Sequence, residues 1–377
     1  MDVTLELKNF RCFHDLRWEP DGVCAVVGAN GSGKSTLFSC VDLLRTTYRE
    51  SFGKALSFNG GPFGLRNLHT PSDETVEIKF CCDGVCWALT PSVENGQSDS
   101  EFGELVTDIN GNVLVERPLY SKKFLFEGKE LLARENSALK LSYEMSSDNT
   151  VVQPITEMLN NFRMYSDYRL FVLRQSGSRS EGDHYLKRGG ENLFSVLRNW
   201  RDRSASRESY EWVRTGMQAA FPNYFSGWEF EIFSQNVSMQ FRLETTADEL
   251  IPASLMPDGV LVALLHLTAV AGAVPGTLIC LDEMENALHP FAIKSLLSTI
   301  RQIARERDLT VALSTHSPVL LDEFKLQPEN VFVLGHRLEG ESNEIATLAQ
   351  LRDPEWLMHF STGTLYSDLE FGSRTSQ

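Results

Sequence analysis

Hydrophobic positions near the N-terminus follow two different spacings in succession. Val3, Leu5 and Leu7 alternate with polar residues, which is typical of a strand with one buried face. A second, wholly apolar strand is predicted over residues 22–27. From Lys34 onward the spacing becomes helical, with apolar side chains at Leu37, Phe38, Val41, Leu44 and Tyr48. The order is therefore strand, loop, helix.

The second half of the chain alternates predicted helices and strands. Residues 192–200 and 209–220 have helical spacing, and strands 228–233 and 237–243 form a predicted hairpin across Ser234-Gln235-Asn236. The elements predicted after the hairpin are an apolar helix from about Gly259, a strand at 277–281, a helix at 290–305 and a strand at 309–314. Strand-helix-strand units build parallel sheets, so we predict an α/β fold around a mixed, largely parallel sheet.

We divide the chain into four predicted segments. Residues 1–150 form an N-terminal lobe that includes an antiparallel β subdomain, because residues 52–150 are rich in Gly, Ser and Asp and contain strand-like stretches. Residues 151–227 form a helical insertion, and residues 228–345 a C-terminal lobe. Residues 346–377 are expected to be a C-terminal tail with a short helix and a frayed end.

The charge of the chain limits its partners. The formal net charge is -16, so most of the surface repels polyanions. Contact with DNA or RNA would need a local basic patch, and a solvated helical face is the alternative explanation for such a run. The candidate residues are Arg163, Arg169, Arg174, Arg179, Lys187, Arg188, Arg198, Arg201, Arg203 and Arg207.

The cysteines and the apolar stretches indicate a cytoplasmic protein. Seven cysteines lack the spacing of a disulfide framework, and we expect Cys81, Cys82 and Cys86 to be packing residues of a strand rather than metal ligands. The N-terminus does not resemble a signal peptide. Residues 259–281 contain no Asp, Glu, Lys or Arg, but Pro275-Gly276 divides them into a buried helix and a strand, so we expect no membrane span.

The loop between the second strand and the first helix matches the pattern G-x-x-x-x-G-K-[ST]. Its glycines allow successive backbone N–H groups to point at phosphate oxygens, and the following helix adds its positive N-terminal end. Lys34 is expected to bridge the β- and γ-phosphates of ATP, and the Ser35 hydroxyl to bind Mg²⁺. The predicted nucleotide-binding residues of this phosphate loop are Gly28, Asn30, Gly31, Ser32, Gly33, Lys34, Ser35 and Thr36.

Two carboxylates follow a short apolar strand further along the chain. Leu278-Ile279-Cys280-Leu281 delivers Asp282 and Glu283 to the C-terminal end of a strand, where ligands bind in open α/β sheets. Helix capping is the alternative role for such acids. Downstream of a phosphate loop, Asp282 is expected to hold Mg²⁺ and Glu283 to polarise the attacking water.

A histidine follows the next predicted strand. His316 lies in Ser314-Thr315-His316-Ser317-Pro318, and a lone histidine in such a place is often a simple core or surface residue. As the third element at a strand end of the same sheet, it is expected to hydrogen-bond the γ-phosphate and the water. Lys34, Glu283 and His316 are thus the predicted catalytic residues.

These motifs, in this order, resemble the ABC ATPase superfamily and especially its soluble, RecF-like and SMC-like branch. Within that branch, the stretch from Asp282 to Pro290 and the Thr315-His316-Ser317-Pro318 element are similar to the ATPases of bacterial antiphage systems, namely the Septu and retron-associated ATPases and the ATPase half of OLD-family proteins. Asn9-Phe10-Arg11-Cys12-Phe13 and the segment 190–197 support the resemblance. It implies an ABC-ATPase head that closes as a homodimer around ATP.

The chain departs from the family pattern at the signature loop, which would supply a serine and a glycine to the ATP held by the partner subunit. Here the loop reads Ser254-Leu255-Met256-Pro257-Asp258-Gly259, so Pro257 replaces the serine. Contact across the dimer would rest on Asp258, on the Gly259 amide and on the start of the following helix, and we expect slow turnover. The glutamine that couples the γ-phosphate to the partner domain in this family is unassigned among Gln97, Gln153 and Gln175.

The resemblance leaves several functions open. The preferred one is an ATPase that controls a separate effector, a nuclease or toxin, in antiphage defence; about 60 residues follow His316, too few for an appended nuclease domain. A RecF-like ATPase of DNA repair and a transporter subunit are the alternatives, and a binding module without hydrolysis is the remaining one.

Overall fold

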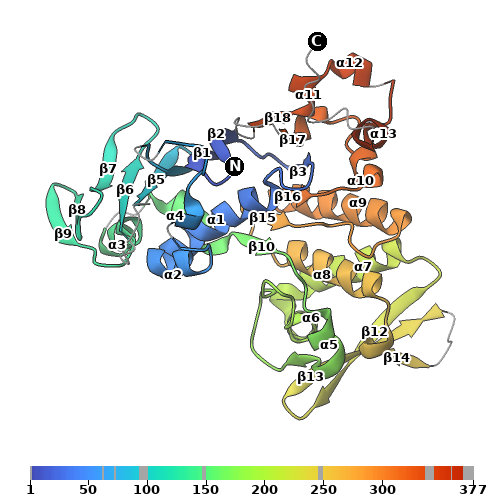
Figure 1. The fold of residues 1–377 in the computed structure, drawn as a ribbon. Helices are drawn as coiled ribbons and strands as arrows, with labels where there is room; N and C mark the ends of the chain where they lie inside the picture. The colour runs from blue at the N-terminus through green and yellow to red at the C-terminus, as the bar shows by residue number, and fades with distance from the viewer. Residues whose placement is uncertain are drawn as a thin grey trace.

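The computed structural model describes residues 2–61, 63–71, 74–92, 101–146, 150–244, 249–335, 344–357 and 359–367. Figure 1 shows an N-terminal β subdomain on one side, a central sheet with helices, and a helical region with a smaller sheet below it. The predicted α/β class with a mixed, largely parallel sheet, an antiparallel β subdomain and a helical insertion is confirmed.

The β subdomain is built around an antiparallel sheet that has eight strands in the described part of the chain. The predicted alternation at Val3 to Leu7 produces strand β1, whose inward side chains are fully or almost fully buried. In spatial order the strands are β2 (Phe13–Trp18), β1 (Val3–Phe10), β4 (Glu77–Cys82), β5 (Val85–Pro91), β6 (Phe102–Thr107), β7 (Val113–Arg117), β8 (Lys123–Phe126) and β9 (Lys129–Leu132).

The central sheet carries the predicted parallel strands. Over the described residues its order is β10 (Arg163–Tyr165), β15 (Leu278–Leu281), β16 (Thr310–Ser314), β3 (Val23–Gly28), β17 (Val331–Gly335) and β18 (Glu344–Thr347). Neighbouring strands from β10 to β17 are parallel, and β18 alone pairs antiparallel. Both faces are covered, which explains why β3 and β15 are wholly apolar.

The period of two residues along β3 assigns its side chains to two cores. Val23, Ala25 and Val27 belong to the core shared with the C-terminal helices, whereas Cys24 and Val26 belong to the core shared with the N-terminal helix and the β subdomain.

The helices are α1 (Lys34–Arg49), α2 (Phe52–Ser57), α3 (Ala138–Met145), α4 (Gln153–Asn161), α5 (Leu170–Ser176), α6 (Leu193–Asp202), α7 (Arg207–Ala220), α8 (Asp258–Ala271), α9 (Pro290–Glu306), α10 (Pro318–Asp322), α11 (Leu348–Leu351), α12 (Pro354–Leu357) and α13 (Thr362–Ser367).

A smaller antiparallel sheet adjoins helices α5 to α7 (Figure 1). The predicted hairpin is confirmed as β12 (Phe225–Phe233) and β13 (Asn236–Leu243). Two short strands, β11 (Ser178–Arg179) and β14 (Leu250–Pro252), also pair with β13.

Two cysteines of the β subdomain correct the sequence prediction. Cys81 of β4 and Cys86 of β5 face each other in the register of the two strands and form a disulfide. The sequence predicts packing roles for both, because the odd number and irregular spacing of the cysteines indicate no pairing. The register of β4 and β5 brings Cys81 and Cys86, five residues apart in the sequence, opposite each other across a tight turn, so they can form a disulfide.

The apolar stretch at residues 259–281 is divided as predicted, since α8 ends at Ala271 and β15 begins at Leu278. None of the helices among the described residues is both long enough and apolar enough to cross a bilayer.

Helix α8 contains a buried histidine. The side chain of His266 is 0% exposed, and its Nδ1 lies 3.1 Å from the hydroxyl of Tyr168. Burial lowers the pKa of His266 to about 4, whereas a histidine in an unfolded chain has a pKa of about 6.5. Between about pH 6.5 and pH 4, the histidine binds a proton in the unfolded chain but not in the folded chain, so the free energy of unfolding falls as the pH drops through this range.

Acidification from neutral pH to about pH 5 is therefore expected to cost about 2 kcal/mol of the free energy of unfolding through His266 alone. Urea denaturation of the wild type and of His266→Gln at both pH values measures this cost. The loss between the two pH values should be smaller in the variant by that amount. An equal loss in both proteins would show that other groups carry the acid sensitivity.

Candidate nucleotide site

Four parallel strands end at the same edge of the central sheet. The strands β10, β15, β16 and β3 are neighbours in this order, so the residues that follow them meet at their C-terminal ends. These residues include Ser166, Asp282 with Glu283, His316, and the phosphate loop that begins at Gly28. The structure thus brings together three motifs that lie far apart in the chain.

The phosphate loop has a backbone that favours glycine. Gly33 has a φ of 105°, and a Cβ there would lie 2.5 Å from Cζ of Phe13 and 2.7 Å from Sγ of Cys12. Gly28 has a φ of 151°, and a Cβ there would lie 2.6 Å from Oγ of Ser32. Both positions therefore exclude larger residues. The loop leads directly into α1, whose first-turn N–H groups face the same edge of the sheet.

Lys34 is held across the loop. Its Nζ donates hydrogen bonds to the carbonyl oxygens of Gly28, at 2.8 Å, and of Ala29, at 3.2 Å. The side chain is buried, and this burial lowers the pKa of Lys34, while the carboxylates of Asp282, Glu283 and Glu285 oppose the shift. The ammonium group and these three carboxylates therefore share one site.

Asp282 joins the loop to the neighbouring strand. Its Oδ2 accepts a hydrogen bond from Oγ of Ser35 at 3.1 Å, and its Oδ1 accepts one from Oγ of Ser314, the last residue of β16. Oγ of Ser314 in turn accepts a hydrogen bond of 2.8 Å from the backbone N–H of Glu283. The two predicted Mg²⁺ ligands, Ser35 and Asp282, are therefore direct neighbours. A hydroxyl and a carboxylate are oxygen donors of the kind that Mg²⁺ prefers, so the pair fits this ion.

The sequence predicts no role for Ser314, but its hydrogen bonds to the carboxylate of Asp282 and to the backbone N–H of Glu283 suggest one. Ser314→Ala is expected to lower ATP turnover about tenfold and to raise the Mg²⁺ concentration needed for half-maximal rate, because groups that orient a metal ligand affect metal affinity by this order. Turnover measured over a Mg²⁺ titration tests the expectation. Ser298→Ala, on the exposed side of α9, is the control. An unchanged Mg²⁺ dependence would contradict a role for Ser314 in holding Asp282.

The two glutamates after Asp282 occupy different positions. Glu283 has a φ of 49°, is exposed, and its Oε2 accepts a hydrogen bond of 2.6 Å from Nδ2 of Asn286. Glu285 lies deeper, and its Oε1 accepts a hydrogen bond of 2.5 Å from the backbone N–H of His316. The second oxygen of Glu285 is buried and has no hydrogen-bond partner among the described residues. Glu285 was not among the predicted site residues, although its spacing of two from Glu283 was visible in the sequence.

His316 lies beside both the phosphate loop and the C-terminal part of the chain. Its Nδ1 is 2.9 Å from the hydroxyl of Tyr366, on α13. The same hydroxyl donates a hydrogen bond of 3.3 Å to the carbonyl oxygen of Gly28. Burial and the charge of Lys34 lower the pKa of His316, against the opposing effect of Glu285, Glu283 and Asp282. Nothing in the sequence indicated Tyr366, which follows His316 by fifty residues in the predicted tail.

The predicted signature loop has other partners within the chain. The carboxylate of Asp258 forms an ion pair with the guanidinium of Arg174, which also donates to the carbonyl oxygen of Met256 at 2.7 Å. A Cβ at Gly259 would lie 2.4 Å from the carbonyl oxygen of Ala287, so α8 begins tightly against the loop that follows Glu283. The structure therefore places Asp258 and Gly259 together, and both contact these neighbours within the same chain.

The three candidate glutamines remain unassigned. Gln97 lies outside the described residues, Gln175 belongs to α5, and Gln153 borders an open pocket together with Thr277, at the opposite end of β15 from Asp282. The residue that follows β10, next to Asp282, is Ser166, whose Oγ accepts a hydrogen bond from Nε of Arg188 at 3.4 Å.

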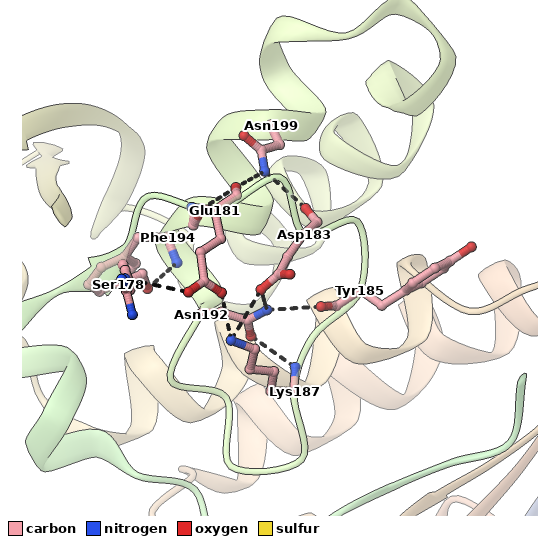
Figure 2. A network of polar contacts seen from close by, with 10 residues as sticks. Ser178, Glu181, Asp183, Tyr185, Lys187, Asn192, Phe194 and Asn199 are labelled. Atoms are coloured by element: carbon pink, nitrogen blue, oxygen red, sulfur yellow. Dashed lines mark hydrogen bonds and ion pairs between the residues drawn. The ribbon is translucent and has the colours of Figure 1, made fainter. Parts of the chain in front are cut away.

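The basic stretch from Arg163 to Arg207 contains many local ion pairs. Figure 2 shows one group, in which Lys187 binds Glu181 and Asp183 while Asn192 donates to Asp183. The other pairs in this stretch are Arg174 with Asp258, Arg179 with Glu181, Arg188 with Asp42, Arg198 and Arg201 with Asp202, and Arg207 with Glu211. Such pairing favours the solvated face over a nucleic-acid patch for these residues.

Family models and solved structures match this chain. A family model described as "AAA domain, putative AbiEii toxin, Type IV TA system" matches residues 155–322, and a second AAA-domain model matches residues 4–176. Among solved structures, an SMC head bound to the C-terminal winged-helix domain of ScpA has a TM-score of 0.51 and 12% identity, over 93% of this chain and 99% of that one. The chain has the fold of an ABC-type ATPase head.

Two further heads are more distant matches. The Smc head from Pyrococcus furiosus, bound to a domain of ScpA, has a TM-score of 0.47 and 13% identity over 93% of this chain and 97% of that one. The SMC head domain from Thermotoga maritima has a TM-score of 0.44 and 13% identity over 92% and 99%. A search of curated proteins gave no match. The matches to two AAA-domain models indicate an ATPase in general terms.

Proposed function

We propose that this head binds ATP with Mg²⁺ in the phosphate loop and hydrolyses it. The observation that carries the proposal is the position of Asp282, which is hydrogen-bonded to Ser35 of the loop and to Ser314 of the neighbouring strand. A carboxylate held between two hydroxyls is expected at a site that binds a metal and a nucleotide. A carboxylate that only caps a helix would instead accept hydrogen bonds from backbone N–H groups.

In the proposed reaction, each residue of the site would have a role. Lys34 and the first amides of α1 would bind the phosphates, and Ser35 and Asp282 would hold Mg²⁺, which neutralises charge that develops on the phosphate oxygens. Glu283 would accept the proton of the attacking water, and the amide of Asn286 would orient the Glu283 carboxylate. His316, supported through its backbone by Glu285, would contact the reacting group.

The complete site would require a second copy of the chain. Gly259 and Asp258 lie at the start of α8, beside the loop that follows Glu283, and would contact ATP held by a partner. Pro257 supplies neither a hydroxyl nor an N–H, so we expect weaker contact across the dimer and slow turnover. Closure around ATP would then control a separate nuclease or toxin effector.

The proposal is tested by measuring phosphate release and molar mass of the full chain with ATP, with ADP and without nucleotide. Hydrolysis together with a dimer in ATP is expected. Absence of both would refute the proposal, and dimerisation without hydrolysis would leave a nucleotide-gated binding module. Recovery of a co-purifying protein identifies the effector, whereas stimulation by gapped DNA that declines with salt would favour the repair alternative.

A further inference from the structure

The C-terminal helix α13 is fixed beside the strand-end histidine. The carboxylate oxygen Oδ1 of Asp322, at the end of α10, accepts hydrogen bonds from Oγ of Ser361 at 2.7 Å and from the backbone N–H of Gly363 at 2.9 Å. A Cβ at Gly363 would lie 2.2 Å from the carbonyl oxygen of Pro318. The start of α13 therefore packs backbone against backbone on α10, two residues beyond His316 in the chain.

This packing brings the hydroxyl of Tyr366 to two groups of the nucleotide site. It lies 2.9 Å from Nδ1 of His316 and 3.3 Å from the carbonyl oxygen of Gly28. A phenol has one proton to donate, and a carbonyl oxygen can only accept. Both contacts are hydrogen bonds at the same time only when the phenol donates to Gly28 and its oxygen accepts from Nδ1 of His316, which then carries a proton.

We propose that Tyr366 is a positioning residue that fixes His316 in the tautomer protonated at Nδ1, which leaves Nε2 as an acceptor for the attacking water. The proposal rests on the function proposed above and makes the role of His316 more specific. A neutral imidazole with a free lone pair on Nε2 accepts a hydrogen bond and cannot donate one to a phosphate oxygen. His316 would therefore orient the water, together with Glu283, instead of binding the γ-phosphate.

Two further contacts are consistent with this arrangement. The backbone N–H of His316 is bound by Glu285, so both the main chain and the ring of His316 are held. The lowered pKa of His316 keeps the ring neutral near neutral pH, the state in which the choice of tautomer has meaning.

The tautomer can be observed without any turnover. In the ¹⁵N-labelled full chain, at a pH well above 6.5, the nitrogen shifts of His316 are expected to show a protonated Nδ1 and an unprotonated Nε2; the signals are assigned by their loss in His316→Gln. In Tyr366→Phe, which keeps the ring but removes the hydroxyl, the tautomers should mix. A wild-type His316 protonated at Nε2, or a tautomer unchanged in Tyr366→Phe, would overturn the proposal.

Kinetics provide the second readout. Tyr366→Phe is expected to lower kcat about three- to tenfold, the effect of one hydrogen bond, with KM and the binding of a non-hydrolysable ATP analogue unchanged. Tyr120→Phe is the matched control, because it removes a hydroxyl that contacts Ser92 in the β subdomain. An equal loss in both variants, or a loss of analogue binding, would contradict a positioning role. If the wild type has no ATPase activity, the proposed function fails, while the tautomer measurement still decides the role of Tyr366.

Discussion

Lys34→Ala is expected to weaken ATP binding on the order of 100-fold or more. The lysine ammonium now donates to two carbonyl oxygens of the phosphate loop, and in the complex it would donate to phosphate oxygens within a buried site. Hydrogen bonds to charged groups contribute about 1.5–3 kcal/mol each, and two of them account for this factor. Binding measured by calorimetry, with and without Mg²⁺, tests the expectation.

The control for this experiment is Lys54→Ala, which removes an exposed lysine paired with Glu50 and should leave ATP affinity unchanged. Because Lys34 also bridges the loop, a thermal melt must establish that the variant is folded. A folded Lys34→Ala protein with wild-type affinity would refute the assignment of the phosphate loop. Loss of ATP-dependent dimerisation in the same variant is also expected, since closure would require bound nucleotide.

Glu283→Gln is expected to reduce hydrolysis by about 10²- to 10⁴-fold while ATP binding is retained. The amide has nearly the same shape and can still bind Asn286, but it cannot accept a proton from water. ATP would then persist in the site, and the dimer should accumulate. Single-turnover hydrolysis and light scattering in ATP measure both consequences.

The structure provides a close comparison for this variant. Glu285 is the other carboxylate at the site, and its contact with the backbone of His316 gives it a supporting role. Glu285→Gln should therefore lower the rate less than Glu283→Gln does. If Glu285→Gln were the inactive variant and Glu283→Gln kept its turnover, the base would be Glu285, whose second oxygen has no partner in the structure.

Strands β3, β15 and β16 of the central sheet were predictable because burial on both faces leaves a strong signal, whereas β10, β17 and β18 were not predicted. Strands β3 and β15 read as continuous apolar runs, and the helix from Lys34 matched its predicted start. The fold class is confirmed on this basis. The roles assigned to Lys34, Glu283 and His316 stay predictions, as do the boundaries of the four segments, because the geometry places these residues without testing their chemistry.

The sequence by itself determined the local chemistry of this protein: a glycine-rich loop that can surround phosphate, and acidic residues and a histidine at the ends of strands. These signals are readable because each depends on neighbours within a few residues.

Only the tertiary structure decided which cysteines pair and which groups complete the site. The Cys81–Cys86 bond came from strand register, Ser314 joined Asp282 across two adjacent strands, and Tyr366 reached Gly28 from the far end of the chain. The physical reason is that such contacts depend on how separate elements pack. A tyrosine in a short helix has no local pattern that distinguishes a surface side chain from one that orients a histidine.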